Sequence, residues 1–505
     1  MKRELTALFL ISVTAAGFYA AVASGAPSLA KFFLALGILA CCGFSLQKVL
    51  GLEGEAGMLL LRTKRGLAQI DRIAQSAPRL WGFLADAGLV VGFGLASLYL
   101  FRKRVPSTAF ITGFLCLLVL WQYVLPAAPA LAIQLINIPE SSKAVGIAGA
   151  SGAELAANPL VSAVLLAFSI GLQFAVMLGG VAFAAVISIA LKAVQTIVVI
   201  ALFAGSFVST PSAPNGDILA HEGPGITPII PGIQIPFTEG ILALIVMLVV
   251  HEGAHAVLAR VAKIPLNSAG VVLFGILPMG AFVDPDEKAL QKMPDAPQNR
   301  VLVAGSSANL VTAVLFLGAF LAFQYAAIAA NPSAHVGEPY VAISGVSANG
   351  SAYGVLEAGM VVTRWRGTNI STVSDFATAS NNTAANSTVA VVTDRGEFNL
   401  TAGENGKVGV GVLESAHTFA DLVRSSEASN PAVPFLFNFL GLCFVLNLLV
   451  GMMNLIPVPP FDGYRIAALR LGGKKLYRNL KAIDALVLFI VMAFAVNLLP
   501  WLWTS

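Results

Sequence analysis

The chain has few charged residues. Asp, Glu, Lys and Arg make up 11% of its 505 residues, against roughly 25% in an ordinary soluble domain. Hydrophobic residues make up 57% of the chain, and the formal net charge is only +4. No long basic tract is present, so nothing in the charge pattern indicates nucleic acid binding. The composition excludes a typical soluble domain and predicts a polytopic α-helical protein of the lipid bilayer.

Cysteine is also scarce. The four cysteines all lie in apolar runs, and no Cys-x-x-Cys pair occurs among Cys41, Cys42, Cys116 and Cys443. Without paired spacing, neither a disulfide scaffold nor a cysteine zinc site is indicated. We expect these side chains to serve as small apolar packing groups.

Long apolar runs are abundant. A membrane-spanning helix needs about 20 apolar residues. The first run follows Met1-Lys2-Arg3, and we expect a retained signal anchor because further spans follow at once. A shorter apolar stretch at 266–283, interrupted by glycines and a proline, is expected to form a re-entrant hairpin. The spans are expected at about 4–24, 29–50, 82–101, 107–126, one or two within 159–208, and then 239–260, 300–327, 433–456 and 483–503.

One segment is predicted to fold outside the membrane. Residues 337–425 contain alternating apolar runs separated by Gly, Asn and Ser turns, which is typical of a small, mainly β domain. The basic residues between 465 and 481 predict that loop 457–482 faces the cytoplasm, which places 337–425 on the other side. An external location agrees with the N-x-S/T sequons of that domain, although such sites also arise by chance. The five sequons lie at Asn349, Asn369, Asn381, Asn386 and Asn399.

The orientation of the front half stays open. Basic residues within 59–79 and at 102–104 both indicate the cytoplasm, but the single span predicted between them would place the two on opposite sides.

Ionisable residues interrupt the apolar run that begins at Ile241. His251 and His255 are four residues apart with Glu252 between them. On a helix the two histidines share one face and can hold one zinc ion, and the glutamate can act as a general base on water. A surface helix with incidental histidines is the alternative, which the apolar surroundings disfavour.

A tetrahedral zinc needs a further protein ligand besides two histidines and water. The sequence Asn454-Leu455-Ile456-Pro457-Val458-Pro459-Pro460-Phe461-Asp462-Gly463 follows an apolar span. Its prolines end the helix, and Gly463 permits a close backbone approach. Asp462 is the candidate ligand; helix capping or pairing with Arg465 is the alternative.

Together, H-E-G-A-H and N-L-I-P-V-P-P-F-D-G resemble the two signatures of the site-2 protease family of intramembrane zinc metalloproteases. Residues 280–285 and 304–309 are similar to the archaeal and eukaryotic branches of that family. Residues 350–370 weakly resemble a PDZ domain. The resemblance covers about 239–503.

The resemblance implies a role for each site residue. Zinc ligands fall on His251, His255 and Asp462, and the general base falls on Glu252. Asn454 falls where the family has an asparagine thought to hold substrate, and helix-to-helix hydrogen bonding is the alternative role.

The resemblance also implies the organisation of the chain. The two halves of the catalytic core fall at 239–330 and 433–505, on either side of the PDZ-like domain at 337–425. The residues before 239 lie outside the resemblance, and their apolar runs predict accessory transmembrane helices at 1–208, followed by an extracytoplasmic loop at 209–238.

The expected function is therefore zinc-dependent cleavage of single-span membrane proteins within the cell membrane. Segment 266–283 either pairs with an extended substrate or only shields the site from lipid. Two other functions stay open: a membrane zinc peptidase that cuts cytosolic or prenylated peptides, and an inactive scaffold that binds partners through the PDZ-like domain. Nothing in the sequence indicates an oligomeric state.

Overall fold

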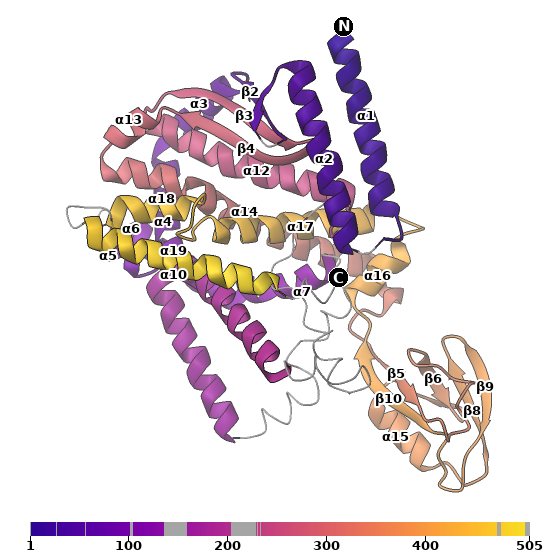
Figure 1. The fold of residues 1–505 in the computed structure, drawn as a ribbon. Helices are drawn as coiled ribbons and strands as arrows, with labels where there is room; N and C mark the ends of the chain where they lie inside the picture. Colours follow the sequence, from indigo (N-terminus) through magenta and orange to yellow (C-terminus); the bar gives the residue numbers. More distant parts are fainter. Residues whose placement is uncertain are drawn as a thin grey trace. The chain divides into compact units, whose positions relative to one another are not determined.

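A computed structural model describes most of the chain (Figure 1). The chain folds into two compact units, Met1–Ala319 with Asn438–Ser505, and Phe320–Phe437. The described residues are 2–26, 28–55, 57–101, 105–135, 159–203, 229, 231–232, 234–471 and 476–499. Most of the predicted loop 209–238, and part of loop 457–482, lie outside these residues.

Seven of the described helices are long and apolar enough to cross a membrane, which confirms the predicted polytopic fold. A π-helical turn at Leu120–Val124 joins α6 to α7 within one of these stretches. A further apolar stretch in α19 (Leu476–Leu498) is shorter, at Asp484–Leu498. The seven stretches fall in α1 (Lys2–Ala23), α2 (Ser28–Leu50), α6 (Ser107–Val119) with α7 (Leu125–Leu135), α10 (Pro159–Phe203), α12 (Phe237–Val261), α14 (Asp295–Ala330) and α17 (Ala432–Met453).

The span predicted at 82–101 is broken in the structure. α4 (Pro78–Phe93) and α5 (Ala96–Leu100) are separated by a turn at Gly94, whose φ is 55°. The turn packs on a second glycine with positive φ, Gly180, where α10 kinks. A side chain at either position would collide with the backbone of the other segment. The described α4 has 16 residues, fewer than a straight span needs.

A four-stranded antiparallel sheet lies beside α12 (Figure 1). The predicted hairpin at 266–283 is present as β3 (Leu266–Phe274) and β4 (Leu277–Pro285). The sequence did not indicate the other two strands, β1 (Glu53–Glu55) and β2 (Met58–Thr63), which extend the sheet in the order β1-β2-β3-β4. Since β2 and β3 pair across more than 200 residues, no local pattern marks their pairing.

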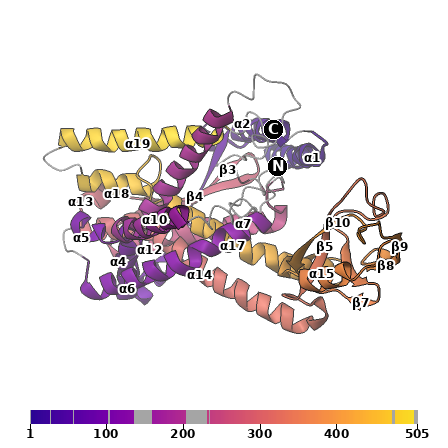
Figure 2. The same cartoon turned by 90° about the horizontal axis from the view of Figure 1, so that it is seen from below.

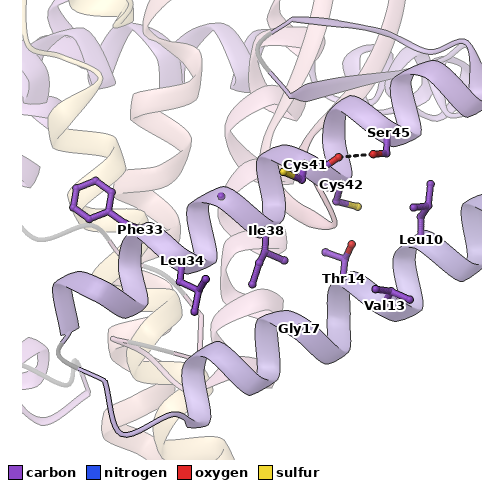
Figure 3. Close-up of a pocket in the computed structure, with 11 residues that line it drawn as sticks. Leu10, Val13, Thr14, Gly17, Phe33, Leu34, Ile38, Cys41, Cys42 and Ser45 are labelled. Carbon is purple, nitrogen blue, oxygen red and sulfur yellow. Dashed lines mark hydrogen bonds between the residues drawn. The ribbon is translucent and has the colours of Figure 1, made fainter.

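The first two helices pack along one another and on the hairpin. Phe18 of α1 and Leu39 of α2 form a buried cluster with Leu277 at the start of β4. Between α1 and α2 lies an open groove of about 480 Å³, and Figure 3 shows the mostly apolar side chains, such as Val13 and Ile38, that line it.

The second unit contains a small antiparallel sheet with its own buried core. Trp365, Ile343 and Val391 are each no more than 1% exposed. Two helices, α15 (Val373–Asn381) and α16 (Phe419–Ser426), begin at capping boxes; Figure 2 shows α15 beside the strands. The strand order is β10-β5-β6-β8-β9 with β7 on β6, for β5 (Pro339–Val346), β6 (Val361–Trp365), β7 (Thr368–Asn369), β8 (Thr388–Thr393), β9 (Gly396–Thr401) and β10 (Val410–Ala416). The small β domain was predicted; its PDZ type stays a prediction.

Candidate metal centre

Two of the candidate ligands project from one face of α12. His251 and His255 are one helical turn apart, and their ring centroids lie 4.9 Å from each other. Their Nε2 atoms are 3.3 Å apart. His251 is buried, at 7% exposure. The sequence places both imidazoles on the same side of the helix because of their i, i+4 spacing.

The third candidate ligand comes from a distant part of the chain. α17 ends at Met453, and Asp462 is the first residue of α18 (Asp462–Leu471). Its Oδ2 atom lies 3.1 Å from His255 Nε2 and 3.4 Å from His251 Nε2. These three side chains form the only group of this kind found among the described residues.

The loop before α18 is tightly folded. The amide of Gly463 donates a hydrogen bond to the carbonyl of Asn454, with a 2.7 Å separation. A Cβ at Gly463 would collide with the backbone of Leu455, as the predicted close approach requires. Arg465 forms an ion pair with Glu287 at 2.7 Å. The alternative role of Asp462, as the ion-pair partner of Arg465, is therefore not seen.

The donor set and its spacing fit zinc. Zinc bonds to nitrogen and oxygen are about 2.0–2.2 Å long, so ligand atoms at tetrahedral angles lie about 3.3–3.6 Å apart. The three observed separations, 3.1, 3.3 and 3.4 Å, are close to that range. An ion among these atoms would hold two neutral imidazoles and one carboxylate together.

α14 supplies the surroundings of the two imidazoles. The carbonyl of Val301 lies 2.7 Å from His255 Nδ1, and the side-chain amide of Asn309 lies 3.1 Å from His251 Nδ1. Gly305 lies between these two residues on the helix, and a Cβ there would lie 2.5 Å from the Nε2 atoms of both histidines. Both Nδ1 atoms are thus occupied, and both Nε2 atoms adjoin a space that only glycine leaves open.

Glu252 contacts the sheet. Its Oε2 atom accepts a hydrogen bond from the amide of Val283 in β4 at 3.1 Å. The amide of Val283 therefore points away from β3 and toward α12. The glutamate is half-buried, and it lines a cavity of about 790 Å³ that also reaches β4.

The cavity is mostly apolar and has walls from both ends of the first unit. Part of the lining comes from Val250 and Glu252 of α12, Ala281 and Val283 of β4, and Val311 of α14. N-terminal residues supply another part, among them Ile70 and Ile73 of α3 (Leu67–Ser76) and Trp81 and Leu84 of α4. A carboxylate that borders an apolar hollow could act as a general base on a bound apolar peptide segment.

The remaining predicted residue, Asn454, bonds locally. Its side-chain amide donates to the carbonyl of Val450, one turn earlier, at 3.1 Å. Its substrate-holding role stays a prediction.

Sequence reasoning missed Val301, Gly305 and Asn309 as partners of the imidazoles. Residues 304–309 are part of the resemblance to the family, but that resemblance assigned no function to any of them. The four-residue spacing of the three is a usable signal, because it places them on one helix face, like the histidines they meet.

The geometry agrees with comparisons with known proteins. The family model described as Peptidase family M50 matches residues 239–497, just over half of the chain. Uncharacterized protein MJ0971 of Methanocaldococcus jannaschii is 25% identical over 237 residues, which cover 46% of this chain and 58% of that protein. The chain thus spans less than two thirds of the length of this curated relative.

Proposed function

Because the chain belongs to peptidase family M50, we propose that it is a zinc-dependent intramembrane endopeptidase of the site-2 protease type. It would hydrolyse peptide bonds in or near transmembrane segments, in regulated intramembrane proteolysis or in the clearance of signal-peptide remnants. The observation that carries the proposal is the convergence of three ligand atoms, 3.1–3.4 Å apart, on helices of a unit rich in membrane spans.

The chain's own residues divide the chemistry between them. His251, His255 and Asp462 would hold the zinc ion. When bound there, zinc supplies Lewis-acid activation of water and of the scissile carbonyl. Glu252 takes the proton from the attacking water and passes it to the leaving amine. The amide of Val283, which donates to Glu252 at 3.1 Å, orients that carboxylate.

The substrate backbone is proposed to pair with β4. In the described sheet β4 is an edge strand, and it borders the cavity together with Glu252. A transmembrane helix has its carbonyls bonded internally, so it must become extended before hydrolysis. An edge strand compensates for that loss because it offers new backbone hydrogen bonds. The amide of Val283, which donates to Glu252, shows which edge of β4 faces α12. Alternation along the strand turns the amide of Ala281 to the same edge, where a substrate carbonyl could accept from it.

We place the protein in the cell membrane with the 337–425 domain outside and loop 457–482 inside. The asymmetry of basic residues supports this orientation. In a chain whose four cysteines are replaced, Ser387→Cys should react with a membrane-impermeant thiol reagent in intact cells, whereas Gly473→Cys should react only after permeabilisation. The opposite labelling pattern would invert the topology.

The β-rich domain is proposed to restrict which substrates enter. It has its own buried core, and the metal ligands lie outside it in the sequence. Replacing residues 337–425 with a Gly/Ser linker should therefore retain zinc and speed cleavage of substrates with large ectodomains. Equal slowing of all substrates, with zinc retained, would instead make the domain a substrate receptor.

The deciding experiment is co-expression with a panel of tagged single-span membrane proteins. Fragments that appear with the wild-type chain and not with Glu252→Ala support the proposal. Glu239→Ala is the matched control, since Glu239 lies in the first turn of the same helix. Cleavage only of soluble or prenylated peptides would identify the other class of membrane zinc peptidase. Partner binding without any cleavage would identify a scaffold.

A further inference from the structure

Asn309 is a buried polar residue to which the proposed mechanism gives no role. It is fully buried on α14, and its side-chain amide is 3.1 Å from Nδ1 of His251. With the amide oriented so that Nδ2 faces the imidazole, its Oδ1 atom is buried with no hydrogen-bond partner in the part of the chain that the structure describes. A buried carbonyl oxygen without a donor is unfavourable, because it has lost its hydrogen bonds to water.

The neighbouring histidine shows which tautomer the site requires. His255 Nδ1 lies 2.7 Å from the carbonyl of Val301, which can only accept a hydrogen bond. The proton of neutral His255 is therefore on Nδ1, and its Nε2 lone pair is directed at the metal position. His251 needs the same tautomer if its Nε2 atom is to serve as a ligand beside that of His255.

The observed amide orientation would give His251 the wrong tautomer. An Nδ2 donor facing Nδ1 makes Nδ1 an acceptor, which puts the proton on Nε2. Rotating the amide of Asn309 by half a turn exchanges its two end atoms, which have nearly the same shape. Its Oδ1 atom then accepts the Nδ1 proton of His251. One rotation thus gives the oxygen a donor and frees the Nε2 lone pair, while the amide N–H groups take the place that the oxygen held.

We infer that Asn309 is a positioning residue that accepts the Nδ1 proton of His251 and holds that imidazole as a zinc ligand. The inference rests on the metal site of the proposed function. α14 carries Val301, Gly305 and Asn309 at four-residue intervals, so the helix meets His255 with a backbone carbonyl and His251 with a side-chain carbonyl. The glycine between them lets the helix approach both rings.

The test compares substitutions that keep or remove the acceptor. Asn309→Asp retains an oxygen acceptor of similar shape, and Asn309→Leu removes it at similar volume. Asn447→Leu is the matched control, because Asn447 is also fully buried but donates to a carbonyl of its own helix, α17. The full chain is purified in detergent, and zinc retained per chain is measured against increasing chelator, with thermal unfolding as the check on folding.

Asn309→Leu should lose about 10–100-fold in zinc affinity, the usual effect of losing a hydrogen bond to a metal-bound histidine. Asn309→Asp should bind zinc at least as tightly as the wild type, and Asn447→Leu should bind it unchanged. Three results would overturn the inference: wild-type affinity in folded Asn309→Leu, equal loss in Asn309→Asp and Asn309→Leu, or equal loss in Asn447→Leu. The proposed function fails separately, when the wild-type chain binds zinc but cleaves no membrane protein.

Discussion

Two regions of the first unit contribute to one site in different ways. The family-matched segments supply all three candidate ligands and Glu252, on α12 and α18. Residues 53–93 lie outside that match, within the part predicted to be accessory. They supply half of the sheet strands and one wall of the cavity. The candidate ligands and Glu252 thus come from the family-matched segments alone, whereas the cavity beside Glu252 is lined by residues of both regions.

The part of the chain that the structure describes shows three ion pairs that join the two regions. Asp86 of α4 accepts two hydrogen bonds from Arg300 of α14, at 2.8 and 2.6 Å. The other two pairs are more exposed, Arg62 with Asp284 at 3.3 Å and Asp71 with Arg260 at 2.8 Å. The pairs should therefore differ in their contribution to stability. Removing one partner of a buried pair leaves an unpaired buried charge, which destabilises the fold far more than the loss of an exposed pair.

The largest effects on cleavage and zinc binding are expected from substitutions in the family-matched segments. Glu252→Ala should lower cleavage by at least about 10²–10⁴-fold, the usual contribution of a general base, while zinc stays bound. Asp462→Ala should lose both cleavage and most of the zinc, because one of three protein ligands disappears. Metal analysis and a cleavage assay on the purified variants measure both. Full zinc occupancy in Asp462→Ala would place the third ligand elsewhere.

Gly305→Ala should also remove zinc, although it deletes no ligand. The added methyl would lie 2.5 Å from the Nε2 atoms of both histidines, where an ion has to fit. Gly318→Ala on the same helix is the matched control, since a Cβ there meets no atom within 4 Å. Elemental analysis of the two folded variants measures the zinc content. Equal zinc in both would mean that α14 shifts readily at Gly305 to make room for the methyl group.

The sequence predicted the parts whose signals are local. Ten uncharged apolar residues followed by H-E-G-A-H predicted α12 and two ligands, and the proline-rich turn before Asp462 predicted the third. It did not predict β1 and β2 or the role of Asn309, because those depend on contacts across distant segments. Arg62 and Asp86 looked like loop and span residues; their partners, Asp284 and Arg300, are more than 200 positions away.

Arg300→Ala tests whether residues 53–93 are integral to the unit. Asp86 is only 3% exposed, so its carboxylate would be left buried and unpaired, at a cost of about 3–5 kcal/mol. We expect a lower thermal unfolding midpoint and reduced zinc content, since Arg300 adjoins Val301. The double variant Asp86→Asn/Arg300→Gln, which removes both charges, should recover much of the loss. Unchanged stability in Arg300→Ala would mean that α4 packs on α14 without needing the pair.

Trp81→Ala tests whether the N-terminal wall selects substrates. Removing the indole enlarges the cavity beside Glu252, so kcat/KM should shift by roughly 10-fold in favour of substrates with larger apolar side chains. Trp81→Phe is the control, because it keeps a ring while losing the 2.8 Å hydrogen bond from Nε1 to the carbonyl of Ile73. A uniform fall across substrates, with the same fall in Trp81→Phe, would assign Trp81 to the stability of α3.

Asp71→Ala should have the smallest effect. The side chains of Asp71 and Arg260 are 40% and 26% exposed, and an exposed pair contributes about 0–1 kcal/mol. Although Nε of Arg260 lies 2.8 Å from Asp71 Oδ1, it makes no well-aligned hydrogen bond within the described residues. We therefore expect Tm to fall by no more than about 2 °C, with zinc content and cleavage unchanged, and the small shift to vanish at high salt. Arg260 lies little more than one turn beyond His255. A marked loss of zinc in Asp71→Ala would therefore mean that α3 fixes the end of α12 through this pair, and residues 53–93 would then share in holding the metal.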